Sequence, residues 1–180
     1  MRRVLQWVLI DWRKHMDSRQ KNDYKVLYES LRDRYCRLLF ITGSQEARSV
    51  FLHQIPDHEN PIQVSRELVK NLHTLPAGQQ TKAVTDFFAR LGEDCSAVFL
   101  SDIEILFDRS LSIDPVKLLK TAARNRAMVV EWPGKIDFSA NTLIYAEPGH
   151  SEYFSTELTD DVLFFDVSGR NSLNKTADRS

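Results

Sequence analysis

Residues 38–52 of the 180-residue chain read LLFITGSQEARSVFL, a short apolar run that passes through a glycine into a polar stretch. The run from Leu38 to Ile41 contains no polar residue, which predicts a strand buried on both faces. The polar stretch predicts a helix over 46–55, beginning just after Gly43. A strand, a glycine-containing loop and a helix in this order form the framework of a phosphate-binding P-loop.

Three more apolar runs follow, separated by segments of helical length. Together the four runs predict strands over 37–42, 62–65, 96–101 and 127–132. Helices are predicted over 67–92, with a break near Pro76, and over 114–124, where Asp114 is expected to cap the helix that starts at Pro115. Buried strands that alternate with helices predict a three-layer α/β domain with a mostly parallel sheet.

Two further apolar runs, 142–146 and 162–167, continue the chain. About nine residues separate Trp132 from Thr142, fewer than a helical crossover requires. The fifth strand is therefore expected to be antiparallel or to follow a shortened turn. We assign 37–168 to a P-loop-like α/β domain, 1–36 to an N-terminal helical arm and the polar residues 169–180 to a flexible tail.

The arm carries apolar residues at helical spacing, which predicts amphipathic helices. Trp7 and Ile10 lie off the main apolar stripe, so we expect them to bind a partner protein or a second copy of the chain; packing against the sheet is the alternative. Residues 1–37 hold ten Lys/Arg and five Asp/Glu, a balance of +5 in a chain of net charge −1. A DNA-binding module is a further alternative, although the interleaved acids favour an ordinary solvated face.

The loop after the first strand departs from a full P-loop, which reads G-x-x-x-x-G-K-[ST]. Its candidate nucleotide-binding residues are Gly43, Ser44, Arg48 and Ser49. The second glycine is missing and Arg48 stands in place of the lysine. Glu46 places a negative charge where phosphates would lie. The loop predicts either an ordinary strand-to-helix turn or a weak, modified phosphate site that takes ATP and Mg²⁺.

Two acidic residues follow the third strand, in the position where P-loop ATPases hold Mg²⁺ or activate water. Asp102 and Glu104 are therefore the candidate catalytic residues, with Ser101 where a first carboxylate would stand. Before the fourth strand, Arg124, Asn125 and Arg126 are candidates for a phosphate sensor or an arginine finger. Capping of the preceding helix by these cations is the alternative.

Composition excludes several other classes. Cys36 and Cys95 are too few for a disulfide framework or a zinc site, and the five histidines form no recognisable nucleophile pair, so no metal site is predicted from them. The apolar run at 4–10 is too short for a membrane span and lacks a cleavage site. A cytoplasmic protein with no membrane partner is expected.

The stretch from Ala97 to Tyr153 contains two unusual strings, WPG at 132–134 and YAEPGHSEY at 145–153. It resembles the BrxF family, small P-loop-containing proteins of type 3 BREX bacteriophage-defence systems. Weaker similarity extends back through IQVSRELVKNL and the first strand, so the resemblance covers about two-thirds of the chain. It implies a cytoplasmic accessory component that acts with a large AAA+ ATPase, a DNA methyltransferase and a phosphatase-like protein.

These observations predict an accessory subunit of phage defence with a P-loop-like fold and a degenerate nucleotide site. It is expected to act through protein assembly rather than as an active ATPase, because the loop lacks its second glycine and its lysine. The alternatives are a weak ATP-binding or ATP-hydrolysing subunit and a DNA-binding module that uses the basic arm.

Overall fold

A computed structural model of the chain describes residues 29–31, 33–52, 61–91, 97–137 and 139–167, with the backbone alone for 49–52. The helices are α2 (Gln45–Leu52), α3 (Val64–Leu72), α4 (Ala77–Arg90) and α5 (Pro115–Ala122), and two 3₁₀ turns, η1 (Glu104–Phe107) and η2 (Arg109–Leu111), precede α5. The strands are β1 (Leu38–Thr42), β2 (Ile62–Gln63), β3 (Ala97–Ser101), β4 (Ala127–Glu131), β5 (Lys135–Asp137), β6 (Thr142–Tyr145), β7 (Phe154–Glu157) and β8 (Leu163–Asp166).

The main sheet has five strands in the order β2-β3-β4-β1-β8, and every neighbouring pair is parallel. The α/β class and the four parallel strands predicted from the apolar runs are confirmed. One predicted strand is shorter than expected, because Val64 and Ser65 already belong to α3. The predicted break near Pro76 separates α3 from α4.

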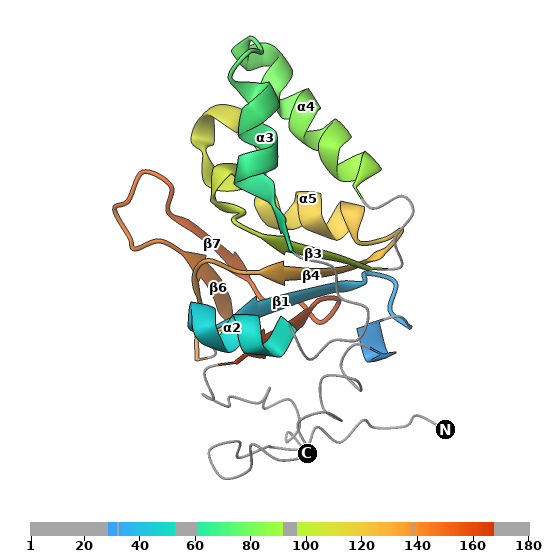
Figure 1. Cartoon of the computed structure of the whole chain (residues 1–180). Helices are drawn as coiled ribbons and strands as arrows, with labels where there is room; N and C mark the ends of the chain where they lie inside the picture. Colours follow the sequence, from blue (N-terminus) through green and yellow to red (C-terminus); the bar gives the residue numbers. More distant parts are fainter. Residues whose placement is uncertain (1–28, 32, 53–60, 92–96, 138, 168–180) are drawn as a thin grey trace, which may run out of the picture.

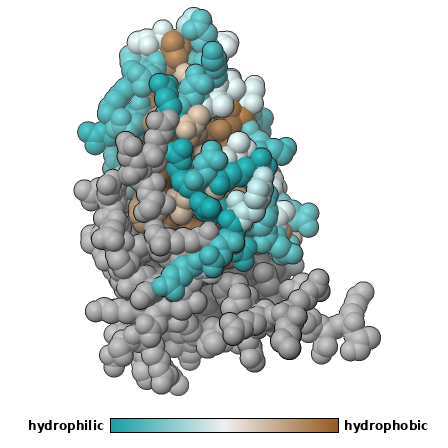
Figure 2. Space-filling model, turned by 90° about the vertical axis from the view of Figure 1, so that its right-hand side faces the viewer, coloured by the Kyte–Doolittle hydropathy of each residue, from teal (hydrophilic) through white to brown (hydrophobic). Residues whose placement is uncertain are grey.

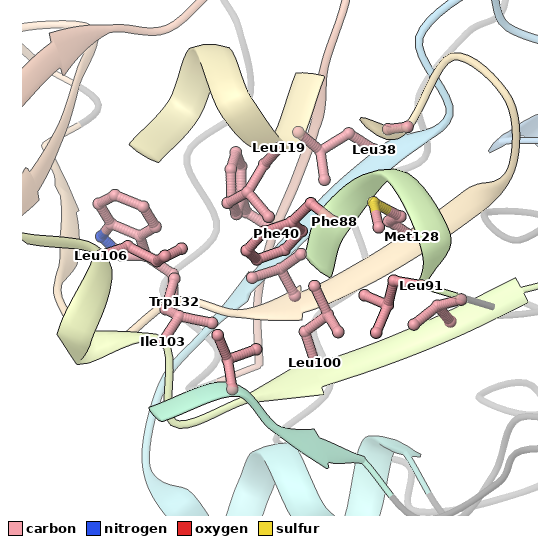
Figure 3. Packing of buried hydrophobic residues seen from close by; sticks show 14 of the residues in the cluster. Leu38, Phe40, Phe88, Leu91, Leu100, Ile103, Leu106, Leu119, Met128 and Trp132 are labelled. Atoms are coloured by element: carbon pink, nitrogen blue, oxygen red, sulfur yellow. The ribbon is translucent and has the colours of Figure 1, made fainter. Parts of the chain in front are cut away.

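Side chains alternate between the two faces of this sheet, and both faces are buried. From β1, Leu38 and Phe40 enter the cluster that α3, α4 and α5 cover, whereas Leu39 and Ile41 enter the cluster on the other face. In Figure 1, α2 lies on the side of the sheet opposite the other three helices, and Figure 3 shows the larger cluster around Phe40. Burial on both faces explains why the strand sequences are continuously apolar.

The small second sheet, β5-β6-β7, is antiparallel and is inserted between β4 and β8. The expectation of an antiparallel fifth strand is thus confirmed, but that strand belongs to a sheet of its own. The last apolar run returns to the main sheet, where β8 lies parallel to β1. The small sheet therefore occupies the place of a crossover helix between two parallel strands.

Trp132 joins the two sheets. Its indole Nε1 donates to the carbonyl oxygen of Ile144 at 2.9 Å, and its ring packs edge-on against Phe40 at 5.2 Å and Phe107 at 5.3 Å. Phe107 in turn stacks on Tyr145 of β6, with ring centroids 3.8 Å apart. The end of β4, the turn η1 and the small sheet are consequently one packed unit.

The surface on the side of α4 is mainly hydrophilic among the residues coloured there, with small separate apolar areas (Figure 2). None of the described helices has the length and the apolar character that a membrane span requires. The helical arm and the tail lie almost wholly outside the described residues.

Candidate functional site

The carboxyl ends of β1, β3 and β4 meet at one edge of the main sheet, and the loop predicted to bind phosphate lies there. Gly43 follows β1 with φ of 123°, a conformation that favours glycine. The hydroxyl of Ser44 accepts a hydrogen bond from the Ala47 N–H at 3.2 Å, which caps the start of α2. Hydrogen bonds from its own backbone N–H and from the Ser44 hydroxyl lower the pKa of the Glu46 carboxyl. The first turn of α2 is thus capped by the chain itself.

Arg48 folds back over this loop. Its guanidinium donates to the carbonyl oxygen of Gly43 at 2.9 Å, and its Nε lies 3.5 Å from the Glu131 carboxylate at the end of β4. Both side chains are more than four-fifths buried, with 18% and 17% of their surface exposed. Nε itself is buried and has no hydrogen-bond partner, so the contact with Glu131 is electrostatic rather than a formed hydrogen bond. Arg48 therefore ties the loop to the neighbouring strand.

Glu131 is the residue of this site that the sequence did not single out. It stands opposite Ile41 in the parallel ladder between β1 and β4. Burial raises the pKa of its carboxyl; the charge of Arg48 lowers that pKa and the charge of Glu104 raises it further. The sequence did carry one sign of this ion pair, a glutamate inside the apolar run AMVVEW. A charge at the end of a buried strand requires a partner.

The two predicted catalytic acids lie at the end of the next strand. Asp102 has φ of 51°, and its carbonyl oxygen accepts hydrogen bonds from the Ser65 N–H at 2.7 Å and the Ser65 hydroxyl at 2.6 Å. Glu104 begins η1 at the surface; partial desolvation of its carboxyl and the charge of Asp102 raise its pKa, and Arg48 lowers it. Arg48, Glu104 and Glu131 therefore form one electrostatic group at this edge.

The other candidates do not join the group. Arg124, Asn125 and Arg126 precede β4 and so lie at its amino end, the opposite edge of the sheet. There the Arg124 guanidinium sits 5.4 Å above the ring of Tyr35, and Arg126 donates to the Ala89 carbonyl at 3.2 Å. These contacts are with Tyr35 and with the last turn of α4, so they show neither capping of the preceding helix α5 nor a sensor or finger role.

The side chains of three predicted residues are not described by the structure. Trp7 and Ile10 lie outside the described residues, and only the backbone of Ser49 is described, within α2. Among the described residues, no group of three or more His, Cys, Asp or Glu side chains is arranged to hold a metal ion.

The chemistry available at this edge follows from its charges. The cation that would face a phosphate, Arg48, is already engaged by Gly43 and Glu131. The surrounding carboxylates of Glu46, Glu104 and Glu131 would repel an anion. Comparison of the chain with protein-family models, with curated proteins and with solved structures gives no match.

Proposed function

We propose that the chain is a non-hydrolysing subunit that uses a P-loop-like α/β domain as a scaffold for protein assembly. The observation that carries this proposal is the position of Arg48, which spans from the Gly43 carbonyl to the Glu131 carboxylate. A P-loop lysine must be free to contact the β- and γ-phosphates. Releasing Arg48 for that purpose would leave the largely buried Glu131 carboxylate without its partner, which is unfavourable for a charge held mostly away from water.

The strand order supports the relationship to P-loop proteins. One strand, β4, lies between the strand that leads into the loop and the strand followed by Asp102 and Glu104. A large group of P-loop ATPases has the same arrangement, with one strand between the loop strand and the acidic strand. This is a likeness of fold alone and carries no activity. We take the biological setting, an accessory role beside a large AAA+ ATPase in BREX phage defence, from the resemblance of residues 97–153 to BrxF.

Calorimetric titration of the full chain with ATP and Mg²⁺ tests the proposal. No affinity tighter than about 100 μM, roughly 5–6 kcal/mol, is expected. A tighter affinity would favour the alternative, a weak ATPase that uses Arg48, Ser49, Asp102 and Glu104. DNA titrated at two salt concentrations tests the other alternative, because binding through the basic arm would weaken steeply with salt.

A defence assay extends the test to the cell. The double variant Arg48→Ala/Glu131→Gln removes the cation without stranding a buried charge, and we expect phage resistance to be nearly unchanged. Arg48→Lys is the matched control, since it keeps the positive charge. Loss of resistance in a double variant that melts like the parent chain would favour the alternative, a weak ATPase.

A further inference from the structure

The amino ends of β1 and β4 lie side by side, at the edge of the main sheet opposite Arg48 (Figure 1). Arg37 links the two strands: its N–H donates to the Ala123 carbonyl at 3.0 Å, and its carbonyl accepts from the Met128 N–H at 2.8 Å. The segments that lead into these strands read RYCR and RNR, so together they hold four arginines and no acidic residue. The amino-edge surface consists of Arg34, Tyr35, Arg37, Arg124 and Arg126.

No carboxylate neutralises these four guanidiniums within the part of the chain that the structure describes. Arg34 donates to the Asp160 carbonyl at 2.9 Å and Arg126 to the Ala89 carbonyl at 3.2 Å, so backbone oxygens orient them and their charge remains. Arg124 is exposed and the other three are exposed in part. Figure 2 looks onto this side of the molecule, where the coloured residues are mostly hydrophilic.

Carboxylates beside the amino-edge surface reduce its charge without cancelling it. Asp161 is paired with the Lys120 ammonium at 2.7 Å, so this pair adds no net charge. Asp33 and Asp160 are exposed, one next to Arg34 in the sequence and the other next to it through its carbonyl. Four guanidiniums against these two carboxylates leave a net charge of +2, in a chain whose net charge is −1. The surface is therefore complementary to an anion.

An exposed aromatic ring lies among these charges. Tyr35 is 77% exposed, more than any other large hydrophobic side chain of the described residues. The Arg124 guanidinium lies over one face of its ring, 5.4 Å from the centroid. The packing of the core does not explain a ring in this position. Its exposure leaves room for a planar group to stack on the other face.

Arginines around an exposed aromatic ring favour a single-stranded nucleic acid over other anions. Guanidinium groups pair with phosphate oxygens in a bidentate geometry, and an unpaired base of any kind stacks on an aromatic ring. A duplex offers phosphates, but its bases are paired and stacked on one another, so none is available to Tyr35. An acidic peptide would satisfy the arginines and leave the ring unused.

We propose that the amino-edge surface binds a single-stranded nucleic acid, with one base stacked on the open face of Tyr35 and neighbouring phosphates paired with the four arginines. This activity goes beyond the proposed assembly role and does not depend on it. It also differs from DNA binding through the basic arm, because Arg124 and Arg126 lie at the start of β4, far from the arm in the sequence.

Fluorescence anisotropy with labelled twelve-residue oligonucleotides tests the proposal on the full chain. A Kd of about 10 μM is expected at about 50 mM salt. If all four arginines contact phosphates, the affinity should fall about fiftyfold between about 50 and 200 mM salt, from a slope of roughly −0.7 per contact. Deoxyuridine and uridine oligonucleotides differ only in the 2′-hydroxyl, so the tighter ligand of the two identifies the strand as DNA or RNA.

Substitutions of the ring test the stacking contact. Tyr35→Ser removes the ring and should weaken binding about tenfold, whereas Tyr35→Phe keeps the ring and should bind like the parent. Tyr153→Ser is the matched control, because Tyr153 is also partly exposed, at 36%, but lies in the turn between β6 and β7. It should leave the affinity unchanged.

Charge reversal tests the phosphate contacts. Arg124→Glu should weaken binding at least tenfold and flatten the salt dependence, because it replaces a phosphate partner by a carboxylate. Arg109→Glu is the matched control, since Arg109 is equally exposed but lies in η2. It should bind like the parent. Melting temperatures check that each variant is folded.

Four results would overturn the inference: no binding at about 100 μM protein, parent-like affinity in Tyr35→Ser, tighter binding of a duplex of the same length, or displacement of the oligonucleotide by an equal concentration of hexaglutamate. Weak binding by Arg13→Glu/Lys14→Glu beside parent-like binding by Arg124→Glu would also overturn it, because the basic arm would then be the site. Failure of the proposed function is a separate result, since tight ATP binding would refute the scaffold role without changing any of these comparisons.

Discussion

Gly134 lies directly beneath the backbone of β6, in the turn between β4 and β5. A Cβ atom at this position would overlap the Ile144 carbonyl oxygen, the same oxygen that accepts the Trp132 indole hydrogen bond. The requirement for glycine comes from this close approach. Any side chain would separate the small sheet from the indole that anchors it.

Gly134→Ala is therefore expected to lower the free energy of unfolding by about 2–4 kcal/mol, through displacement of β6 and loss of the indole hydrogen bond. Urea unfolding monitored by tryptophan fluorescence measures the change. Gly78→Ala is the control, because nothing lies within 4 Å of a Cβ there and the residue is in α4; it should be neutral or stabilising by up to about 1 kcal/mol. Equal stabilities for the two variants would contradict the account.

Individual residues also mark the limit of the sequence prediction. Asp114 was identified as a helix cap from local spacing, and its carboxylate accepts from the Lys117 N–H at 3.0 Å as expected. The role of Glu131 could not be recognised in the same way. It depends on β4 lying next to β1, a pairing between residues about ninety positions apart. Local patterns identify caps, whereas ion pairs between distant strands require the topology.

At the scale of elements, an ion pair connects α5 to the turn before β8. The Lys120 ammonium lies 2.7 Å from the Asp161 carboxylate and also donates to the Thr159 hydroxyl at 3.3 Å. Partial burial raises the pKa of the Asp161 carboxyl. Hydrogen bonds from Lys120 and Thr159 outweigh this effect together and hold the pKa below its usual value. The connection helps to hold the edge strand β8 against the domain.

A lowered pKa in the folded state means that the ionised carboxylate stabilises the fold above the ordinary value of 3.8 and that this contribution disappears as pH falls through the folded pKa. Asp161→Asn is expected to cost up to about 1 kcal/mol at pH 7, since the carboxylate is half exposed, and nothing near pH 2. Thermal unfolding at both pH values measures this difference. Lys82→Ala is the control: Lys82 is exposed on α4 and makes no hydrogen bond or ion pair within the described residues, so the cost of this variant should be alike at both pH values.

The parallel strands of the main sheet were easier to predict from the sequence than the small antiparallel sheet, because they are more deeply buried. The parallel strands are buried on both faces, so they can be recognised in the sequence as apolar runs such as AVFLS and AMVVE. The small sheet has short strands with only part of each side buried, and β5, KID, contains a single apolar residue. Its stability comes from Trp132 and Phe107, which belong to other parts of the chain. The apolar run at 142–146 therefore revealed only its central strand, β6, whereas β5 and β7 carry too few apolar residues to be recognised.

At the scale of the whole molecule, the N-terminal arm is fixed at the end that the structure describes. Leu31, the last helical residue described before β1, is fully buried in the cluster on the α2 face of the main sheet. The end of the arm therefore packs on the face opposite the one that α3, α4 and α5 cover.

The expectation that Trp7 and Ile10 of the N-terminal arm bind a partner protein or a second copy can be tested in the full chain. Trp7→Asp and Ile10→Asp are each expected to weaken self-association, or co-purification with the AAA+ ATPase that the resemblance implies, at least tenfold, because a charge in an interface core removes its anchor. Gln6→Asp is the matched control, since it adds the same charge at a neighbouring polar position. Sedimentation and pull-down measure association, and melting temperature measures folding. If the arm packs on its own sheet instead, Trp7→Asp will lower the melting temperature while association persists. A docking arm predicts the reverse pattern, an unchanged melting temperature with association lost, so the pair of measurements decides between the two.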